Sequence, residues 1–394
     1  MKQKNLFPFI LTISVVVFVG IILLLFYPSL SETAEIESEE ENDTGSDGEI
    51  TTGVNIHQTE AFPVIYVSVF THIEEASIRY PNFVDDEENF WAYREAIVAF
   101  AEMLQEEDVS YNFQSDWTFL LAATEYDEGT ATTDNKNFLQ YLKEDLHVEI
   151  DPHAHETKYT YADVAYLIEQ LGVTPSFVVG GLIASPSEDS KLEYLWTPIK
   201  GKQYPSYTWK AEVGWGGGTS LHQNEEALWV SGIWKPQDNE HFLVHDDDAP
   251  LTVIGHYNSG WDGLDELLEL QEQGVLSPGK IYTISIPGLM LSQLGEDVVL
   301  TEEYKNYIEE FREQIQSYED ETATGKIKWV GLGEVYDIWL TEYNAEPNQL
   351  FYTDIHTDEA DSSTTPSFSG ESSCGDGVCQ LLEKKRGLCE EDCG

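Results

Sequence analysis

Residues 64–75 read Val-Ile-Tyr-Val-Ser-Val-Phe-Thr-His-Ile-Glu-Glu: seven uncharged, largely apolar residues, then five of which four are polar. Such a run, rich in β-branched and aromatic residues, is typical of a strand buried on both faces. Residues 86–107 follow, with an apolar face at the 3.6-residue period of a helix, formed by Phe90, Tyr93, Ile97, Phe100 and Leu104. This stretch therefore predicts a strand–helix unit, the repeating part of an α/β fold.

The same order recurs along the chain. Further strands are predicted at 111–117, 147–150, 176–182, 251–254, 280–286 and 326–332, and further helices at 136–145, 161–171, 263–273, 302–318 and 334–340. The number of units predicts an irregular (β/α)7–8 barrel over 54–356, interrupted by an aromatic-rich insertion at about 185–250; an open doubly wound sheet is the alternative. No Gly-x-Gly-x-x-Gly or P-loop motif follows a strand, so no nucleotide site is predicted.

The N-terminal flank predicts a membrane anchor. Residues 6–27 are uncharged and apolar, long enough to cross a bilayer, and the lysines precede them. Positive charge stays inside, so residues 1–5 are predicted to be cytoplasmic and the bulk of the chain extracytoplasmic, on a single-pass cell-membrane protein. A cleaved signal peptide, with secretion, is the alternative. The acidic segment 31–53 is predicted to be a flexible stalk.

The C-terminal flank predicts a small disulfide module. A Ser/Thr-rich linker, 357–373, leads to residues 374–394, which hold all the cysteines of the chain: Cys374, Cys379, Cys389 and Cys393. An even count in a short extracytoplasmic segment predicts two disulfides, with three possible connectivities. A zinc knot is the alternative, and the acidic residues of the segment offer a calcium site. The segment resembles the short Cys-Gly-Asp-Gly-x-Cys modules that end many secreted prokaryotic proteins.

The charge excludes some partners. With 73 acidic and 20 basic residues, the formal net charge is −53. Such a surface disfavours nucleic acid and anionic membrane faces. It suits a cationic ligand, a neutral polymer or a salty environment, and it is also what a merely solvated surface would show.

Polar residues follow three predicted strands and suggest a metal site. His72 and Glu74 follow the first strand, Asp116 follows the second, and His153 and His155 follow the third. Alternate residues of a strand point to one side, so each pair sends both side chains to one rim. Imidazoles with a carboxylate are zinc ligands, and the expected cofactor is a divalent metal, zinc first. The alternative is that these histidines only hydrogen-bond loop backbone.

The same rim offers groups for catalysis and for substrate binding. Asp151, Glu74 and Glu334 are the candidate general bases. Without a metal, facing carboxylates would act as the acid and base of a glycosidase. Aromatic and histidine side chains near the rim are predicted to bind substrate: Trp117, Trp215, His222 and His245.

Residues 147–171 resemble the polysaccharide-deacetylase superfamily of irregular (β/α) barrels, through Glu149-Ile-Asp-Pro-His-Ala-His155. His72-x-Glu74 looks like a variant first motif of such barrels. The family's Asp-Asp first motif is missing here, and its paired histidines stand four residues apart, where this chain has Thr157. The resemblance implies a metal-dependent hydrolase of an acylated sugar or glycan, with a carbohydrate polymer as partner. The alternatives are a metal-free glycoside hydrolase and a non-catalytic glycan-binding or partner-binding envelope protein.

Overall fold

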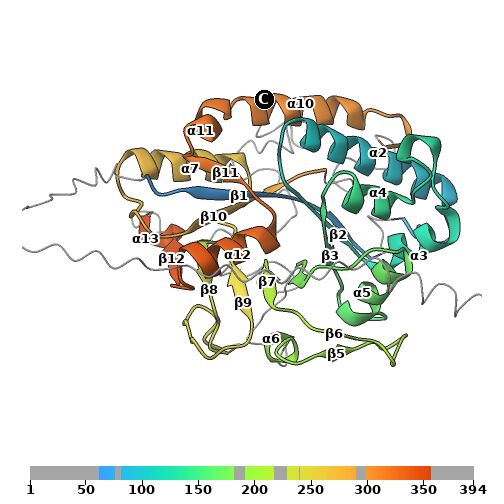
Figure 1. Ribbon diagram of the computed structural model, residues 1–394, viewed down its shortest axis with the longest axis horizontal. Helices are drawn as coiled ribbons and strands as arrows, with labels where there is room; N and C mark the ends of the chain where they lie inside the picture. The colour runs from blue at the N-terminus through green and yellow to red at the C-terminus, as the bar shows by residue number, and fades with distance from the viewer. Residues whose placement is uncertain are drawn as a thin grey trace, which may run out of the picture. The chain divides into compact units, whose positions relative to one another are not determined.

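The computed structural model describes residues 62–75, 81–181, 191–216, 229–238, 240–289 and 299–355 (Figure 1). The predicted anchor, stalk, linker and disulfide module, together with His222, lie outside these ranges. Among the helices that are described, none is both long enough and apolar enough to span a membrane.

The first of two main sheets is parallel. It has the order β10 (Tyr282–Pro287), β1 (Ile65–Ile73), β2 (Tyr111–Ser115), β3 (Glu149–Pro152), and β11 (Ile327–Trp329) also pairs with β1. Strand β1 is buried along its whole length, as its uncharged sequence predicts. Its first half pairs with β11 and its second half with β2, which brings the carboxyl ends of β1, β2 and β3 to one edge.

The second sheet is mixed. It has the order β12 (Asn348–Phe351), β8 (Val230–Trp234), β9 (Thr252–Ile254), β7 (Val213–Trp215), β4 (Val178–Val179). Pairs β4–β7 and β7–β9 are parallel, whereas β8 and β12 run antiparallel to their neighbours. A separate hairpin joins β5 (Ile199–Lys200) to β6 (Thr208–Trp209).

The two sheets meet at both margins. One margin is the isolated parallel bridge between His153 and Gly180. At the other, Thr283 N donates to Ser231 Oγ at 2.9 Å and Ser285 N to the His256 carbonyl at 3.4 Å. No strand ladder in the described residues joins the sheets, so the predicted closed barrel is replaced by two facing sheets. The physical reason is that β4 has only two residues and β8 runs in the opposite direction.

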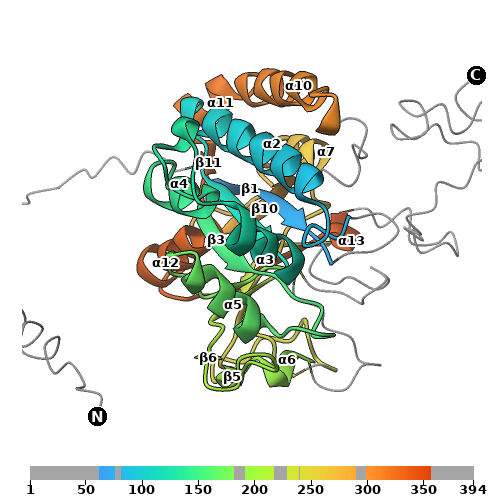
Figure 2. The same cartoon turned by 90° about the vertical axis from the view of Figure 1, so that its right-hand side faces the viewer.

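Helices cover the outer face of the first sheet. Figures 1 and 2 show α2 (Glu87–Glu106), α4 (Phe138–Glu144), α7 (Trp261–Glu272) and α10 (Tyr304–Gln316) together on one side of β1 and β10. The other helices are α3 (Trp117–Tyr126), α5 (Tyr161–Gln170), α6 (Lys191–Tyr194), α11 (Glu319–Ala323), α12 (Leu332–Glu342) and α13 (Tyr352–Ile355), with a 3-10 turn at Ala131–Thr133. The apolar face predicted for 86–107 is buried in α2.

A second apolar core fills the space between the sheets. Tyr66 and Phe70 of β1 pack there with Val213 of β7, and α12 contributes Val335 and Trp339. Burying such side chains is worth about 1.5–3 kcal/mol each. The first sheet is therefore held on both faces, which fixes the strand ends that carry the site.

Several elements differ from the sequence prediction, β2 and β7 among them. The strand predicted to end at Trp117 ends at Ser115, because the Asp116 side chain caps α3 by accepting from Thr118 N at 2.8 Å. Strand β7 lies inside the predicted insertion, where its three residues, Val213–Trp215, carry too short a pattern to be recognised.

Candidate metal centre

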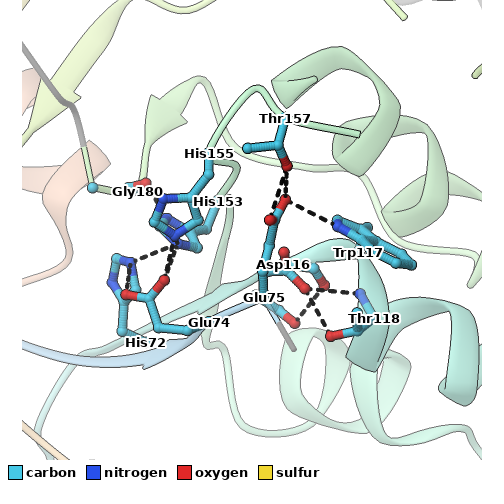
Figure 3. A network of polar contacts seen from close by, with 12 residues as sticks. His72, Glu74, Glu75, Asp116, Trp117, Thr118, His153, His155, Thr157 and Gly180 are labelled. Atoms are coloured by element: carbon cyan, nitrogen blue, oxygen red, sulfur yellow. Dashed lines mark hydrogen bonds and ion pairs between the residues drawn. The ribbon is translucent and has the colours of Figure 1, made fainter. Parts of the chain in front are cut away.

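Two strand ends build the site. His72 and Glu74 alternate at the end of β1, and His153 and His155 alternate just after β3. Each pair therefore points to the same side of its strand. The side chains converge between the sheets (Figure 3). The structure thus brings together four of the predicted site residues from segments about 80 positions apart.

Ligand atoms of these residues are in mutual contact. His72 Nε2 lies 3.1 Å from His153 Nε2, and His153 Nε2 lies 3.1 Å from Glu74 Oε2. His155 Nε2 contacts Glu74 Oε2 and lies 3.3 Å from His153 Nε2. One atom each from His72, Glu74 and His153 falls within a 4.8 Å group. Donors arranged tetrahedrally at zinc bond lengths would be about 3.3 Å apart, so these separations fit a single ion.

The tautomer of His153 also fits a cation. Its Nδ1 lies 2.8 Å from the Gly180 carbonyl, which only accepts, so Nδ1 carries a hydrogen. In the neutral ring, Nε2 then directs a lone pair at the Glu74 carboxylate. Opposed lone pairs repel unless a cation lies between them. Either a proton on His153 Nε2 or a metal ion would remove this repulsion. A hydrogen bond from the other ring nitrogen to a backbone carbonyl, as Nδ1 makes here, is usual for a metal-binding imidazole.

Burial and mutual charge shift the pKa values of the group. Burial, reinforced by the neighbouring His153 charge, lowers the pKa of His72 to about 3. Burial opposes the charged form of His153 as well, but the Glu74 carboxylate outweighs it and raises the pKa of His153. Burial would also raise the pKa of Glu74, yet His153 and His155 hold that pKa far below its usual range. The carboxylate is therefore ionised and His72 is neutral, the forms that bind metals.

A glycine pair forms the wall behind the histidines. A methyl group built on Gly181 would lie 2.8 Å from His72 Cε1 and 3.0 Å from His153 Nδ1. Gly181 also has φ of +73°, a conformation that favours glycine. A methyl on Gly180 would meet the Gln114 side chain at 2.9 Å. The sequence interpretation missed this pair, although Gly-Gly directly after an apolar run is the signal that could have found it.

Asp116 lies beside the cluster but is not among its contacting atoms. Ser115 pairs with Ile73 on β1 and Pro152 on β3, so Asp116 continues the row that holds Glu74 and His153. Its side chain is fully buried; Oδ1 accepts from Thr118, and Oδ2 has no hydrogen-bond partner in the described ranges. Burial raises the pKa of Asp116 to about 6. Asp116 is therefore a buried carboxylate with one uncommitted oxygen.

Asp151 lies deeper between the sheets. It is fully buried and accepts hydrogen bonds from Asn112 at 2.9 Å, Gln114 at 3.2 Å and Ser176 at 2.6 Å. Burial raises its pKa, and burial together with Asp151 raises the pKa of Glu149. The satisfied, enclosed position of Asp151 suits support of the strands better than contact with a substrate.

Glu334 lies away from the cluster. It is an exposed residue in the first turn of α12 and lines a cavity of about 430 Å³ with Ser110, His147, Glu149 and Ser176. Several of these residues precede β2, β3 and β4, so the cavity is at the opposite ends of the strands from the histidines. Glu334 lies on a helix, as predicted, but the strand before it stops at Trp329 rather than at Leu332, so Glu334 is not at a strand end beside the histidines.

The predicted substrate-binding residues are separated. Trp215 is only 4% exposed, packs on Phe70 with ring centroids 4.3 Å apart, and donates to Ser285 Oγ at 2.8 Å. It is thus an inner wall of the site rather than an open platform. His245 contacts Asp247 and Lys235, in the region before β9. Trp117 lies beside the cluster, half-buried (Figure 3).

Comparison with known proteins does not identify a family. No protein-family model matches the chain, and a search of curated proteins returns no match. Among solved structures, the 4-alpha-glucanotransferase from Thermococcus litoralis matches with 14% identity and a TM-score of 0.39. The match covers 73% of this chain and 41% of that one, so the chain spans about two fifths of that enzyme. A likeness this slight identifies neither family nor activity.

Proposed function

We propose that this protein is a metal-dependent hydrolase of carbohydrate, with His72, Glu74, His153 and His155 holding a divalent ion, zinc first. The observation that carries the proposal is the convergence of one ligand atom each from His72, Glu74 and His153 within 4.8 Å, with His155 Nε2 in contact with the same Glu74 carboxylate. The competing explanation is a buried ion pair between Glu74 and a protonated His153. Metal content separates the two.

The surrounding residues have distinct tasks in this proposal. A bound metal would supply Lewis-acid chemistry toward a carbonyl oxygen. The Gly180 carbonyl keeps the hydrogen of His153 on Nδ1, so that Nε2 faces inward. With Glu74 among the ligands, Asp116 is the nearby carboxylate with an uncommitted oxygen, and we assign it the role of accepting a proton from the attacking water.

The substrate class rests on sequence resemblance. The Glu149-to-His155 stretch resembles the polysaccharide-deacetylase superfamily, which implies an acylated sugar or glycan as substrate. The half-buried Trp117 beside the cluster offers an aromatic surface of the kind on which sugar rings stack. Hydrolysis of an N-acetyl or O-acetyl group is therefore the reaction to test first.

Acetate release tests the activity. Full-length protein is stripped with chelator, reloaded with zinc, cobalt, nickel or manganese, and incubated with acetylated xylan and with N-acetylglucosamine oligomers. We expect acetate from at least one substrate in a reloaded sample and none with chelator present. Cleavage of glycosidic bonds that persists in chelator would favour the metal-free glycosidase instead. No product from any reloaded sample would contradict the proposed activity.

We further propose that residues 6–27 anchor the enzyme with its bulk outside the cell, on the strength of their apolar composition and the preceding lysines. Protease added to intact cells should then degrade a C-terminally tagged protein, while a cytoplasmic marker survives. Full protection of the tag in intact cells, with digestion after lysis, would contradict this orientation.

A further inference from the structure

The same strand ends that carry the metal cluster carry a second assembly, here called the aromatic rim. It consists of Glu75, Trp117, Thr157, Lys158 and Tyr159. Glu75 follows Glu74, Trp117 follows Asp116, and Thr157 comes two residues after His155. A molecule in contact with the cluster therefore has the rim as its neighbour (Figure 3).

Contacts fix the Trp117 indole in one orientation. Its Nε1 donates to Glu75 Oε1 at 3.1 Å, and Thr157 Oγ1 holds the same carboxylate at 2.6 and 2.8 Å. One ring contact is a stack on Tyr159, with centroids 4.5 Å apart and planes at 14°. The indole is nonetheless only half-buried. An aromatic surface held in advance loses little entropy when a ligand stacks on it.

Lys158 gives this surface a positive charge. Its Nζ lies 4.3 Å from the Trp117 centroid and 5.6 Å from that of Tyr159, and it makes no ion pair within the described residues. Some lysines of this acidic chain are instead engaged by carboxylates, such as Lys305 and Lys326 at 2.6 and 3.0 Å. An exposed cation–π contact is worth about 0.5–1 kcal/mol, less than a hydrogen bond to a charged group. Lys158 can therefore exchange its ring contact for an anion.

We propose that the aromatic rim is a subsite for a sugar that carries an anionic group, with Trp117 stacking on the ring and Lys158 pairing with the anion. The proposal rests on the proposed function for its substrate class and deepens it. The net charge of −53 does not forbid such a ligand, because exposed charges beyond about 8 Å are largely screened at physiological salt while Lys158 acts at contact.

Three glycosides that differ only at C6 test this. Ligand-observed NMR titrations of full-length protein use methyl β-glucoside, methyl β-glucuronide and methyl β-glucoside 6-phosphate. We expect one acidic glycoside or both to bind about fivefold more tightly than the glucoside, as a single charge-assisted contact would provide. Comparison of the two acidic probes shows whether carboxylate or phosphate is preferred. Equal affinities, a preference for the glucoside, or no binding of any probe would overturn the proposal.

Matched variants locate the effect. Lys158→Gln should reduce the preference for the acidic probe over the glucoside to less than twofold. Lys305→Gln removes an exposed charge on α10 and should leave the preference intact. An undiminished preference in Lys158→Gln would also overturn the assignment. Metal content measured on the same samples separates the two proposals. If the protein prefers the acidic glycosides but binds no metal, only the metal-dependent hydrolase is rejected. If it binds metal but shows no such preference, only the anionic-sugar subsite is rejected.

Discussion

Gly181, which follows β4 of the second sheet, packs against the histidines of the proposed metal site. Substitution Gly181→Ala would place a methyl group 2.8 Å from His72 and 3.0 Å from His153, so the rings must move apart. We expect metal affinity, measured by competition with a chromophoric chelator, to fall at least tenfold, by about 1.4 kcal/mol or more. Gly274→Ala is the matched control, because Gly274 has φ of +71° but no atom within 4 Å of the added methyl. Equal affinities in both variants would show that the glycine does not shape the site.

Asp116 has a proton-transfer role in this account, separate from metal binding. Asp116→Asn should keep the metal content of the wild type and lower turnover by about 100-fold or more, the usual size of an acid–base contribution. Elemental analysis and initial rates on the same preparation separate the two quantities. Loss of the metal in this variant would make Asp116 a ligand instead, as the sequence interpretation had it.

The candidate ligands could be predicted from sequence because a strand has a period of two. Once the ends of the two strands are placed correctly, the alternation of side chains puts His72 and Glu74 on one side of their strand, and His153 and His155 on one side of theirs. Their contacts are long-range, however, and so are those of Gly181 and Lys158. Residues of this kind have no local pattern that names their partners, which is why the glycine wall was missed and why Trp117 alone of the aromatic rim was predicted.

At the scale of elements, Asp163 joins helix α5 to the β5–β6 hairpin. Its carboxylate accepts from Lys202 N at 2.8 Å and from Gln203 N and Tyr204 N at 2.9 Å, besides capping α5 through Thr160. Burial opposes ionisation, but these backbone hydrogen bonds lower the pKa of Asp163. The ionised form therefore stabilises the fold above the unfolded pKa of about 3.9, and this contribution is lost as pH falls through the lowered folded value.

Asp163→Asn tests this connection. Its free energy of unfolding in urea should be about 1–3 kcal/mol below that of the wild type at pH 7, and the difference should shrink below about pH 4. Asp320→Asn, on the exposed surface of α11, should match the wild type at each pH. A difference between Asp163→Asn and wild type that stays constant down to pH 3 would contradict the electrostatic explanation.

Most elements could be predicted because they are long and periodic. Helices α2, α5, α7 and α10 lie within three residues of their predicted bounds at each end. Helix α3 was missed because the predicted strand was extended to Trp117, across the Asp116 N-cap at which the helix begins. Sheet closure was mispredicted because the number of strands does not reveal that β4 is short and β8 antiparallel.

At the scale of the whole molecule, charge repulsion opposes the folded state. With a net charge of −53, like charges crowd together on folding, and salt screens them. We expect the thermal midpoint of the full-length protein to rise by about 5 °C or more between 0.05 and 1 M NaCl. Sucrose at matched osmolality controls for preferential exclusion and should have a smaller effect. A flat or falling midpoint would show that the acidic surface costs the fold little.

Metal content is the measurement that tests the central claim most directly. Full-length protein, purified without chelator and reloaded, is assayed by elemental analysis beside His153→Ala and His241→Ala. His241 is an exposed histidine that contacts Asp238, so its variant controls for the loss of an imidazole. The account predicts about one divalent ion per chain in the wild type and in His241→Ala, and far less in His153→Ala. No bound ion in the wild type after reloading, or equal content in all three proteins, would contradict it.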